Sequence, residues 1–163
     1  MSQKITPFLW FDNNAEEAMD FYCSVFKDSE VLGVSRYGEA GPGPAGSVLV
    51  ATLRLNGQEF MALNGGPEFK FTEAVSFSIE CETQEEVDHY WDKLSAGGEP
   101  GPCGWLKDKF GLSWQVVPRI LGELMQDEDR AKADRVTRAM LQMSKLDIAQ
   151  LQAAYNEEEL ATV

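Results

Sequence analysis

The chain has 163 residues, a formal net charge of −13 and 44% hydrophobic residues, a composition typical of a globular protein with one well-formed core. Nucleic-acid binding depends on clustered Lys and Arg, so this acidic balance predicts no nucleic-acid partner. No apolar run approaches the roughly 18 residues of a membrane span, and the N-terminus lacks a signal-peptide pattern, so we expect a cytoplasmic protein with no membrane partner.

The first predicted elements are a strand and a helix. Residues 4–11 (KITPFLWF) are rich in β-branched and aromatic residues, which favour strands. Asn14 followed by Glu17 has the spacing of a helix N-cap with a capping-box acid, and apolar residues then recur at helical spacing. We therefore expect a helix over residues 14–26.

Three strands should follow this helix. Residues 29–37 alternate in polarity as a strand does, whereas residues 38–46 (GEAGPGPAG) predict a loop because Gly and Pro interrupt regular structure. Residues 47–55 and 58–63 flank an Asn-Gly dipeptide at 56–57, the pattern of a hairpin with a primed turn.

The same order of elements then recurs. Residues 74–82 (AVSFSIECE) alternate as a strand, and Thr83 with Glu86 repeats the capping box of a helix that should end at 97–98. At an offset of 69 residues, Asn14 falls on Thr83 and Phe8 on Phe77. An internal repeat of this kind predicts two copies of one structural unit.

The second copy closes on the hairpin GWLKDKFGLSWQ. Its strands, 105–107 and 112–117, mix aromatic and polar residues at alternating positions, which predicts one face in the core and the other lining a cavity. Asp108 and Gly111 form the turn between them. This hairpin matches the earlier one at an offset of 54 residues, and the segment 98–104 (GEPGPCG) leaves little room for a further strand.

These elements predict an α+β fold with two βαβββ modules, at about 1–66 and 74–118, whose curled sheets pair around a groove. Residues 119–163 should form a helical extension, with helices at 120–126, 129–145 and 147–156. The last two helices carry an apolar stripe that packs either on the protein's own sheet or on a second subunit. We expect a homodimer. The stripe consists of Val136, Ala139, Met140, Met143, Ile148, Leu151 and Tyr155.

Three segments in this order, ITPFLWFDNNAEEAMDFY, CGWLKDKFGLSWQVVP and MLQMSKLDIAQLQAAY, resemble the PhnB-like branch of the vicinal-oxygen-chelate superfamily. The resemblance covers nearly the whole chain. It implies the glyoxalase/bleomycin-resistance/dioxygenase fold, in which a metal lies between the modules and dimers are common. The ligands in that pattern are a His, Gln or Glu near the start of each module's first strand and a Glu late in each last strand.

Carried over by this resemblance, the four ligand positions fall mostly on apolar residues. The last-strand positions fall on Gln115 and on Met61, or Ala62 if the register slips by one. The first-strand positions fall on Ala74 and on Ile5, or Pro7 if the helix sets the register. A divalent ion needs three or four N, O or S ligands, so we expect no bound metal and no cofactor.

The candidate ligand contacts are residues expected to face the groove. Ser113 and Gln115 alternate with Trp114, so they face the groove if Trp114 packs against the helices. Trp105 is an aromatic wall for a planar ligand, although large aromatics in strands are more often core. The full predicted set is Met61, Asn64, Ser76, Ser78, Trp105, Ser113 and Gln115.

Two residues are candidates for catalysis, each with a structural alternative. Asp108 either caps its turn or acts as a general base at the cavity rim. Cys103 is either a small buried residue or a thiol whose pKa is lowered by Lys107 and Lys109. The single histidine, His89, lies among acids on a predicted helix and is expected to be solvated.

The leading functional hypothesis is a metal-free protein that binds a small apolar or aromatic molecule in the groove between the modules. The first alternative is an enzyme of the superfamily, a lyase, isomerase, dioxygenase or transferase, that uses Asp108, Cys103 or a metal. Some PhnB-like proteins carry the label of a ubiquinone-pathway methyltransferase, yet no strand, Gly-rich loop and helix of the kind that binds the usual methyl donor stands in the sequence. A third hypothesis is a regulatory partner that acts through its C-terminal helices.

Overall fold

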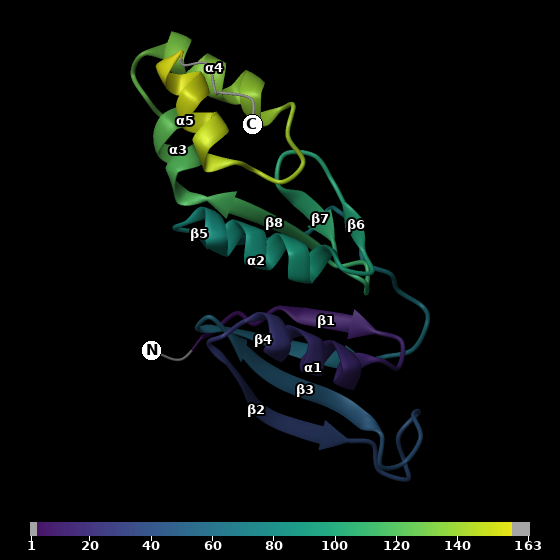
Figure 1. The fold of residues 1–163 in the computed structure, drawn as a ribbon. Coiled ribbons are helices and arrows are strands. Elements are labelled where there is room, and N and C mark those ends of the chain that lie inside the picture. Colours follow the sequence, from purple (N-terminus) through teal and green to yellow (C-terminus); the bar gives the residue numbers. More distant parts are fainter. Residues whose placement is uncertain (1–2, 158–163) are drawn as a thin grey trace. The chain divides into compact units, whose positions relative to one another are not determined.

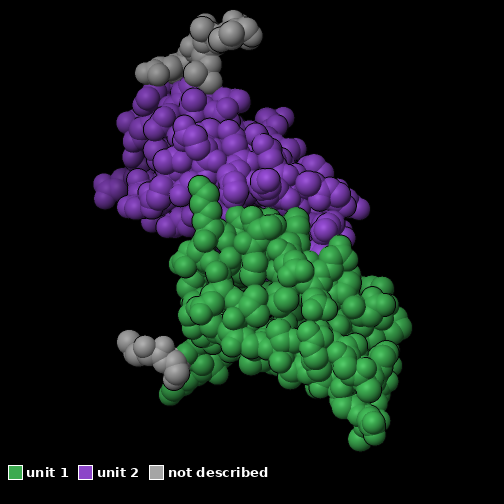
Figure 2. Space-filling view, turned by 60° about the horizontal axis from the view of Figure 1, so that its bottom comes forward, with its two compact units in different colours: residues 1–71 green, residues 72–163 purple. Residues whose placement is uncertain are grey.

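The computed structural model describes residues 3–157 and divides into two compact units, residues 1–71 and 72–163 (Figure 2). Each unit has its own four-stranded sheet. None of the helices in the described part of the chain has the length and apolar character that crossing a membrane requires.

Unit 1 is a βαβββ module (Figure 1). Its sheet has the order β1-β4-β3-β2, in which β1 is parallel to β4 and the other neighbours are antiparallel. The predicted hairpin is confirmed: Asn56 and Gly57 have φ of 46° and 83°, the left-handed values of a primed turn. The elements are β1 (Phe8–Phe11), α1 (Ala15–Val25), β2 (Ser29–Arg36), β3 (Val48–Leu55) and β4 (Gln58–Asn64).

One face of this sheet packs against α1 and forms the core of unit 1. On β3 and β4, every second side chain is buried, as a two-residue strand period requires. Burying a large apolar side chain contributes about 1.5–3 kcal/mol, which makes this helix-covered face the main source of stability in the unit. The buried residues are Ala18, Tyr22 and Val25 of α1 with Ala51, Leu53, Leu55, Phe60 and Ala62 of the sheet.

Unit 2 repeats the module, with the sheet order β5-β8-β7-β6 and β5 parallel to β8. The α+β architecture of two βαβββ modules is thereby confirmed. The segment 98–104, in which a strand was not expected, does contain a two-residue strand, because residues 99 and 100 pair with β7. The elements are β5 (Ser76–Cys81), α2 (Gln84–Ser95), β6 (Glu99–Pro100), β7 (Trp105–Lys107) and β8 (Ser113–Pro118).

The repeat is real, but the predicted offset of the first strands is wrong by one residue. Phe8 pairs with Met61, and Ser78 pairs with Gln115, so Phe8 corresponds to Ser78 rather than to Phe77. The link between the first strand and its helix is one residue longer in unit 1, which explains why the helices match at 69 and the strands at 70.

The two repeated helices begin in different ways. The hydroxyl of Thr83 accepts from the Glu86 amide at 3.3 Å, and the Glu86 carboxylate accepts from the Glu82 amide at 2.7 Å, a reciprocal cap. Asn14 makes no such side-chain bond. The side chain of Asn64, at the end of β4, accepts from the Ala15 amide at 2.8 Å instead, so a distant residue caps α1.

Three helices complete unit 2: α3 (Arg119–Met125), α4 (Arg130–Met140) and α5 (Ile148–Asn156). The prediction that the middle helix continues to residue 145 is wrong. The chain leaves the helix after Met140, and the carbonyls of Met143 and Ser144 accept from the amides of Cys103 and Gly104 at 2.8 and 2.7 Å. These bonds attach the connection between α4 and α5 to the sheet.

The apolar stripe of the terminal helices packs within unit 2. Val136 and Leu151 are fully buried in a cluster with Leu121 and Leu146, and Met140, Met143 and Tyr155 pack against it. Of the two predicted alternatives, the structure therefore supports packing on the chain's own unit. The homodimer stays a prediction, and it can no longer be argued from this stripe.

Candidate functional site

The helix-free face of the unit 2 sheet carries most of the predicted contact residues. In the strand register, Ser113 lies beside Ser76 and Lys107, while Gln115 lies beside Ser78 and Trp105. Strand neighbours share a face. Trp114 and Leu106 point the other way and are buried. The Gln115 amide donates to the Ser76 hydroxyl at 3.0 Å, which places both side chains on this face.

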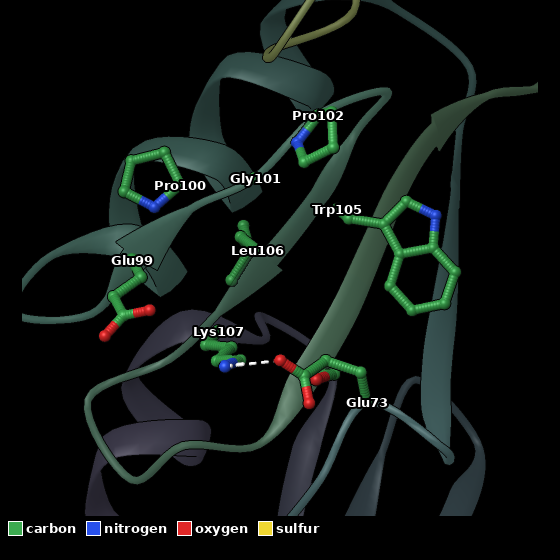
Figure 3. A pocket seen from close by; sticks show the side chains of 9 residues that line it. Glu73, Glu99, Pro100, Gly101, Pro102, Trp105, Leu106 and Lys107 are labelled. Atoms are coloured by element: carbon green, nitrogen blue, oxygen red, sulfur yellow. Dashed lines mark ion pairs between the residues drawn. The ribbon is translucent and has the colours of Figure 1, made fainter.

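A cavity of about 410 Å³ opens on this part of unit 2 (Figure 3). The short edge strand β6 and its Gly/Pro continuation form one wall, and β7 and β8 form the floor. The Trp105 indole and the ion pair between Glu73 and Lys107 border the cavity. The lining residues are Glu73, Glu99, Pro100, Gly101, Pro102, Trp105, Leu106, Lys107 and Ser113.

The Ser113 hydroxyl is the most informative atom of the cavity. The residue is 1% exposed, and its Oγ has no hydrogen-bond partner among the described residues. Leaving a buried hydroxyl without a partner costs about 1–3 kcal/mol relative to a satisfied one. A bound molecule with a polar atom near Oγ would remove that cost.

The repeat explains why this cavity exists in unit 2. At the offset of 54 residues, Ser113 corresponds to Glu59, and its register neighbour Lys107 corresponds to Arg54, the neighbour of Glu59. In unit 1, Arg54 and Glu59 fill this position with an ion pair at 3.1 Å. In unit 2 the small serine leaves the position open, and Lys107 pairs with Glu73.

The charged residues of the cavity belong mainly to its rim. The hydrogen bond and charge of Glu73 raise the pKa of Lys107, and Lys107 lowers the pKa of Glu73 in the same way. The Glu73 side chain is 60% exposed, so water screens this pair and it adds little to stability. The charge of Glu99 also raises the pKa of Lys107.

Asp108 lies in the turn and not on the cavity wall. It is 2% exposed. Its Oδ1 accepts from the amides of Phe110 and Leu112 at 2.9 and 3.1 Å, and its Oδ2 accepts from the Trp114 indole at 2.9 Å. A carboxylate held in this way is a turn-stabilising group, and the geometry favours that interpretation over a general base.

Cys103 is also absent from the cavity lining. It has a left-handed φ of 57°, and its amide donates to Met143. The two lysines expected to activate the thiol have other partners: Lys107 binds Glu73, and the Lys109 ammonium lies 5.2 Å from the Phe110 ring centre. These contacts favour a structural role.

Met61 and Asn64 lie on β4 of unit 1, so they belong to the other unit. The Asn64 amide is already used, since it donates to the Val48 carbonyl at 3.0 Å and accepts from Ala15. Asn64 lines a separate cavity of about 370 Å³ beside Tyr37. The structure therefore does not add these two residues to the unit 2 cavity.

The residues at the expected metal positions do not fit a divalent ion. Ile5 and Ala74 lie before the strands begin, and Met61 and Gln115 offer one thioether and one amide that is bonded to Ser76. Across residues 3–157, no group of three or more His, Cys, Asp or Glu side chains is arranged to hold a metal. This donor set lacks the carboxylates, imidazoles or thiolates that such ions need.

Several lining residues escaped prediction. Glu73 precedes β5, while Glu99, Pro100 and Pro102 belong to the segment for which no strand was expected. The available signal was the position of that segment beside the second hairpin, where an edge element must run for the sheet order to repeat. Its Gly and Pro content concealed this role.

Comparisons with known proteins place the chain in context. Residues 3–117 match the family model described as 3-demethylubiquinone-9 3-methyltransferase. One similar solved structure is a putative 3-demethylubiquinone-9 3-methyltransferase, a PhnB protein from Bacillus cereus. It is 46% identical, the match covers 71% of this chain and 99% of that one, and the TM-score is 0.64.

More distant structures share the fold alone. A protein from Pseudomonas aeruginosa is 22% identical over 72% of this chain and 98% of that chain, with a TM-score of 0.60. The fosfomycin resistance protein FosX from Listeria monocytogenes is 17% identical over 76% of this chain and 98% of that one, with a TM-score of 0.51. No curated protein matches the chain significantly.

Proposed function

The chain belongs to the PhnB family described as 3-demethylubiquinone-9 3-methyltransferase and has the vicinal-oxygen-chelate fold, and on that basis we propose that it binds a small molecule in the unit 2 cavity. The ligand has an apolar or aromatic body and a polar atom that meets the Ser113 hydroxyl. The observation that carries this proposal is the buried hydroxyl without a partner on the cavity wall.

The form of the cavity supports a small organic ligand. Its volume of about 410 Å³ lies within the range of about 300–1,000 Å³ that is usual for such sites. Trp105 offers an aromatic wall, and the prolines of the β6 segment offer rigid apolar surface. Few polar groups reach the interior, so they would orient the ligand while apolar contact provides most of the affinity.

We further propose that binding requires no resident metal, because the side chains at the family's ligand positions supply too few suitable donors. Enzymatic alternatives that use Asp108 or Cys103 have less support. Neither residue is among those that line the cavity, and Asp108 is buried with both oxygens in hydrogen bonds. No feature of the described residues favours methyl transfer over binding.

The test compares Ser113→Ala with a matched control, Ser78→Ala. Ser78 is an exposed serine on the same sheet face and does not line the cavity. Aromatic alcohols would be screened by thermal shift, and hits would be measured by calorimetry. Loss of one hydrogen bond should weaken binding about threefold to tenfold in Ser113→Ala, and the control should match the unmodified protein.

The free protein provides a second readout. Because Ser113→Ala removes a buried hydroxyl that lacks a partner, the ligand-free variant should be at least as stable as the unmodified protein. Trp105→Leu should also weaken binding by removing the aromatic wall. The proposal would be wrong if Ser113→Ala lowered stability and left the affinity of every hit unchanged.

A further inference from the structure

We infer that the ligand of the unit 2 cavity is a small organic cation, such as a protonated amine, attached to an apolar or aromatic body. This inference rests on the proposed function, since it names the chemical class of the molecule bound at the same site. It follows from the charges at the cavity and from the partners that those charges already have.

The ionisable lining residues are two carboxylates and one ammonium group, those of Glu73, Glu99 and Lys107. At neutral pH they sum to one negative charge. Lys107 is the only cation among the lining residues, and it is paired with Glu73. An anionic ligand would have to displace Glu73 from Lys107 and would then face both carboxylates.

Glu99 provides the contact for a cation. It lies on the edge strand beside Lys107 in the register, and no ion pair in the described part of the chain involves it. Its carboxylate is therefore available to a positively charged group. A charge pair at a partly solvated rim contributes only about 0.2–1 kcal/mol, so it selects the class of ligand without dominating the affinity.

Two other features favour positive charge. An aromatic face attracts a cation through the ring quadrupole, and Trp105 is the largest aromatic surface on the wall. The chain as a whole has a net charge of −13, and a field of that sign raises the local concentration of cations. Both effects act against carboxylate or phosphate ligands of similar size.

The test uses three probes with one ring system: naphthylmethylamine, which is protonated at neutral pH, naphthylmethanol and naphthoate. Calorimetry at low salt should show that the ammonium compound binds about threefold to tenfold more tightly than the alcohol and that the carboxylate binds most weakly. Added salt should reduce the preference for the cation and leave the alcohol nearly unaffected.

Two variants with the same change in net charge separate a local effect from a global one. Glu99→Gln should reduce the affinity for the ammonium compound to about that for the alcohol. Glu39→Gln removes an exposed carboxylate in the loop of unit 1 and should leave all three affinities unchanged. An equal effect of both variants would overturn the assignment of Glu99.

The outcomes distinguish this inference from the proposed function. If the alcohol and the ammonium compound bind equally, or if the carboxylate binds best, the cation preference is overturned, while sensitivity of the alcohol to Ser113→Ala would still support the cavity as a binding site. If none of the three probes binds at millimolar concentration, both proposals are overturned.

Discussion

Replacement of Asp108 by asparagine should destabilise the protein strongly, although the change removes one oxygen's charge and little volume. The carboxylate is buried and accepts from two turn amides and from the Trp114 indole at 2.9–3.1 Å. The asparagine oxygen can keep the turn amides, but its NH₂ group then faces the indole N–H, and two donors meet without an acceptor.

The expected magnitude follows from these contacts. A buried donor that loses its acceptor costs about 1–3 kcal/mol, and bonds to a charged acceptor are about twice as strong as neutral ones. Asp108→Asn should therefore lower the free energy of unfolding by about 2–4 kcal/mol. With a urea dependence of about 1–3 kcal/mol per molar, the midpoint should fall by about 1 M or more.

Urea unfolding followed by circular dichroism measures this change, and Asp134→Asn is the matched control. Asp134 is exposed on α4 and loses the same charge. In a Trp114→Phe background the indole donor is gone, so Asp108→Asn should cost less there by about 1–2 kcal/mol. Equal midpoints for Asp108→Asn and Asp134→Asn would refute the structural role and revive a surface role for this carboxylate.

Four further expectations follow from the structure. Thr83→Ala should cost about 1 kcal/mol and Asn14→Ala clearly less, because only Thr83 caps its helix through its side chain; the reverse order in urea unfolding would contradict the assignment. The hydrogen bond from Lys145, followed by that from Gln84, lowers the pKa of Asp88 below its ordinary 3.8, so this stabilisation is present above that value and is lost as pH falls through the lowered pKa. Lys145→Met should therefore reduce stability at about pH 7 more than at about pH 2, and an equal loss at both would argue against the pair. Elemental analysis after purification without chelator should find less than about one-tenth equivalent of Zn, Fe, Mn or Ni, whereas near-stoichiometric metal would disprove metal-free binding. Sedimentation at micromolar concentration is expected to show a homodimer, for which exposed Val31 and Val34 on the edge strand β2 offer apolar surface; a monomer near 18 kDa would exclude it.

Short-range patterns in the sequence were sufficient for the elements and their order. The Asn-Gly turn at 56–57, the cap at Thr83 and the turn held by Asp108 each involve residues within six positions of one another. Such local interactions are encoded by spacing alone. Strand alternation likewise predicted that Trp105, Ser113 and Gln115 share a face, because side chains on a strand alternate whatever the strand packs against.

Contacts between distant segments were decided only by the tertiary structure. Asn64 caps a helix that begins 49 positions earlier, and the connection after α4 leaves the helix because its carbonyls bond residues 103 and 104. The pairing of Glu73 with Lys107 and the isolation of the Ser113 hydroxyl are of the same kind. Each depends on which backbone and side-chain groups the folded sheet brings together, and no spacing along the chain encodes that. The sequence therefore predicted the face on which the cavity lies, while the position of the cavity and its charge come from the packing of the edge strand and its neighbours.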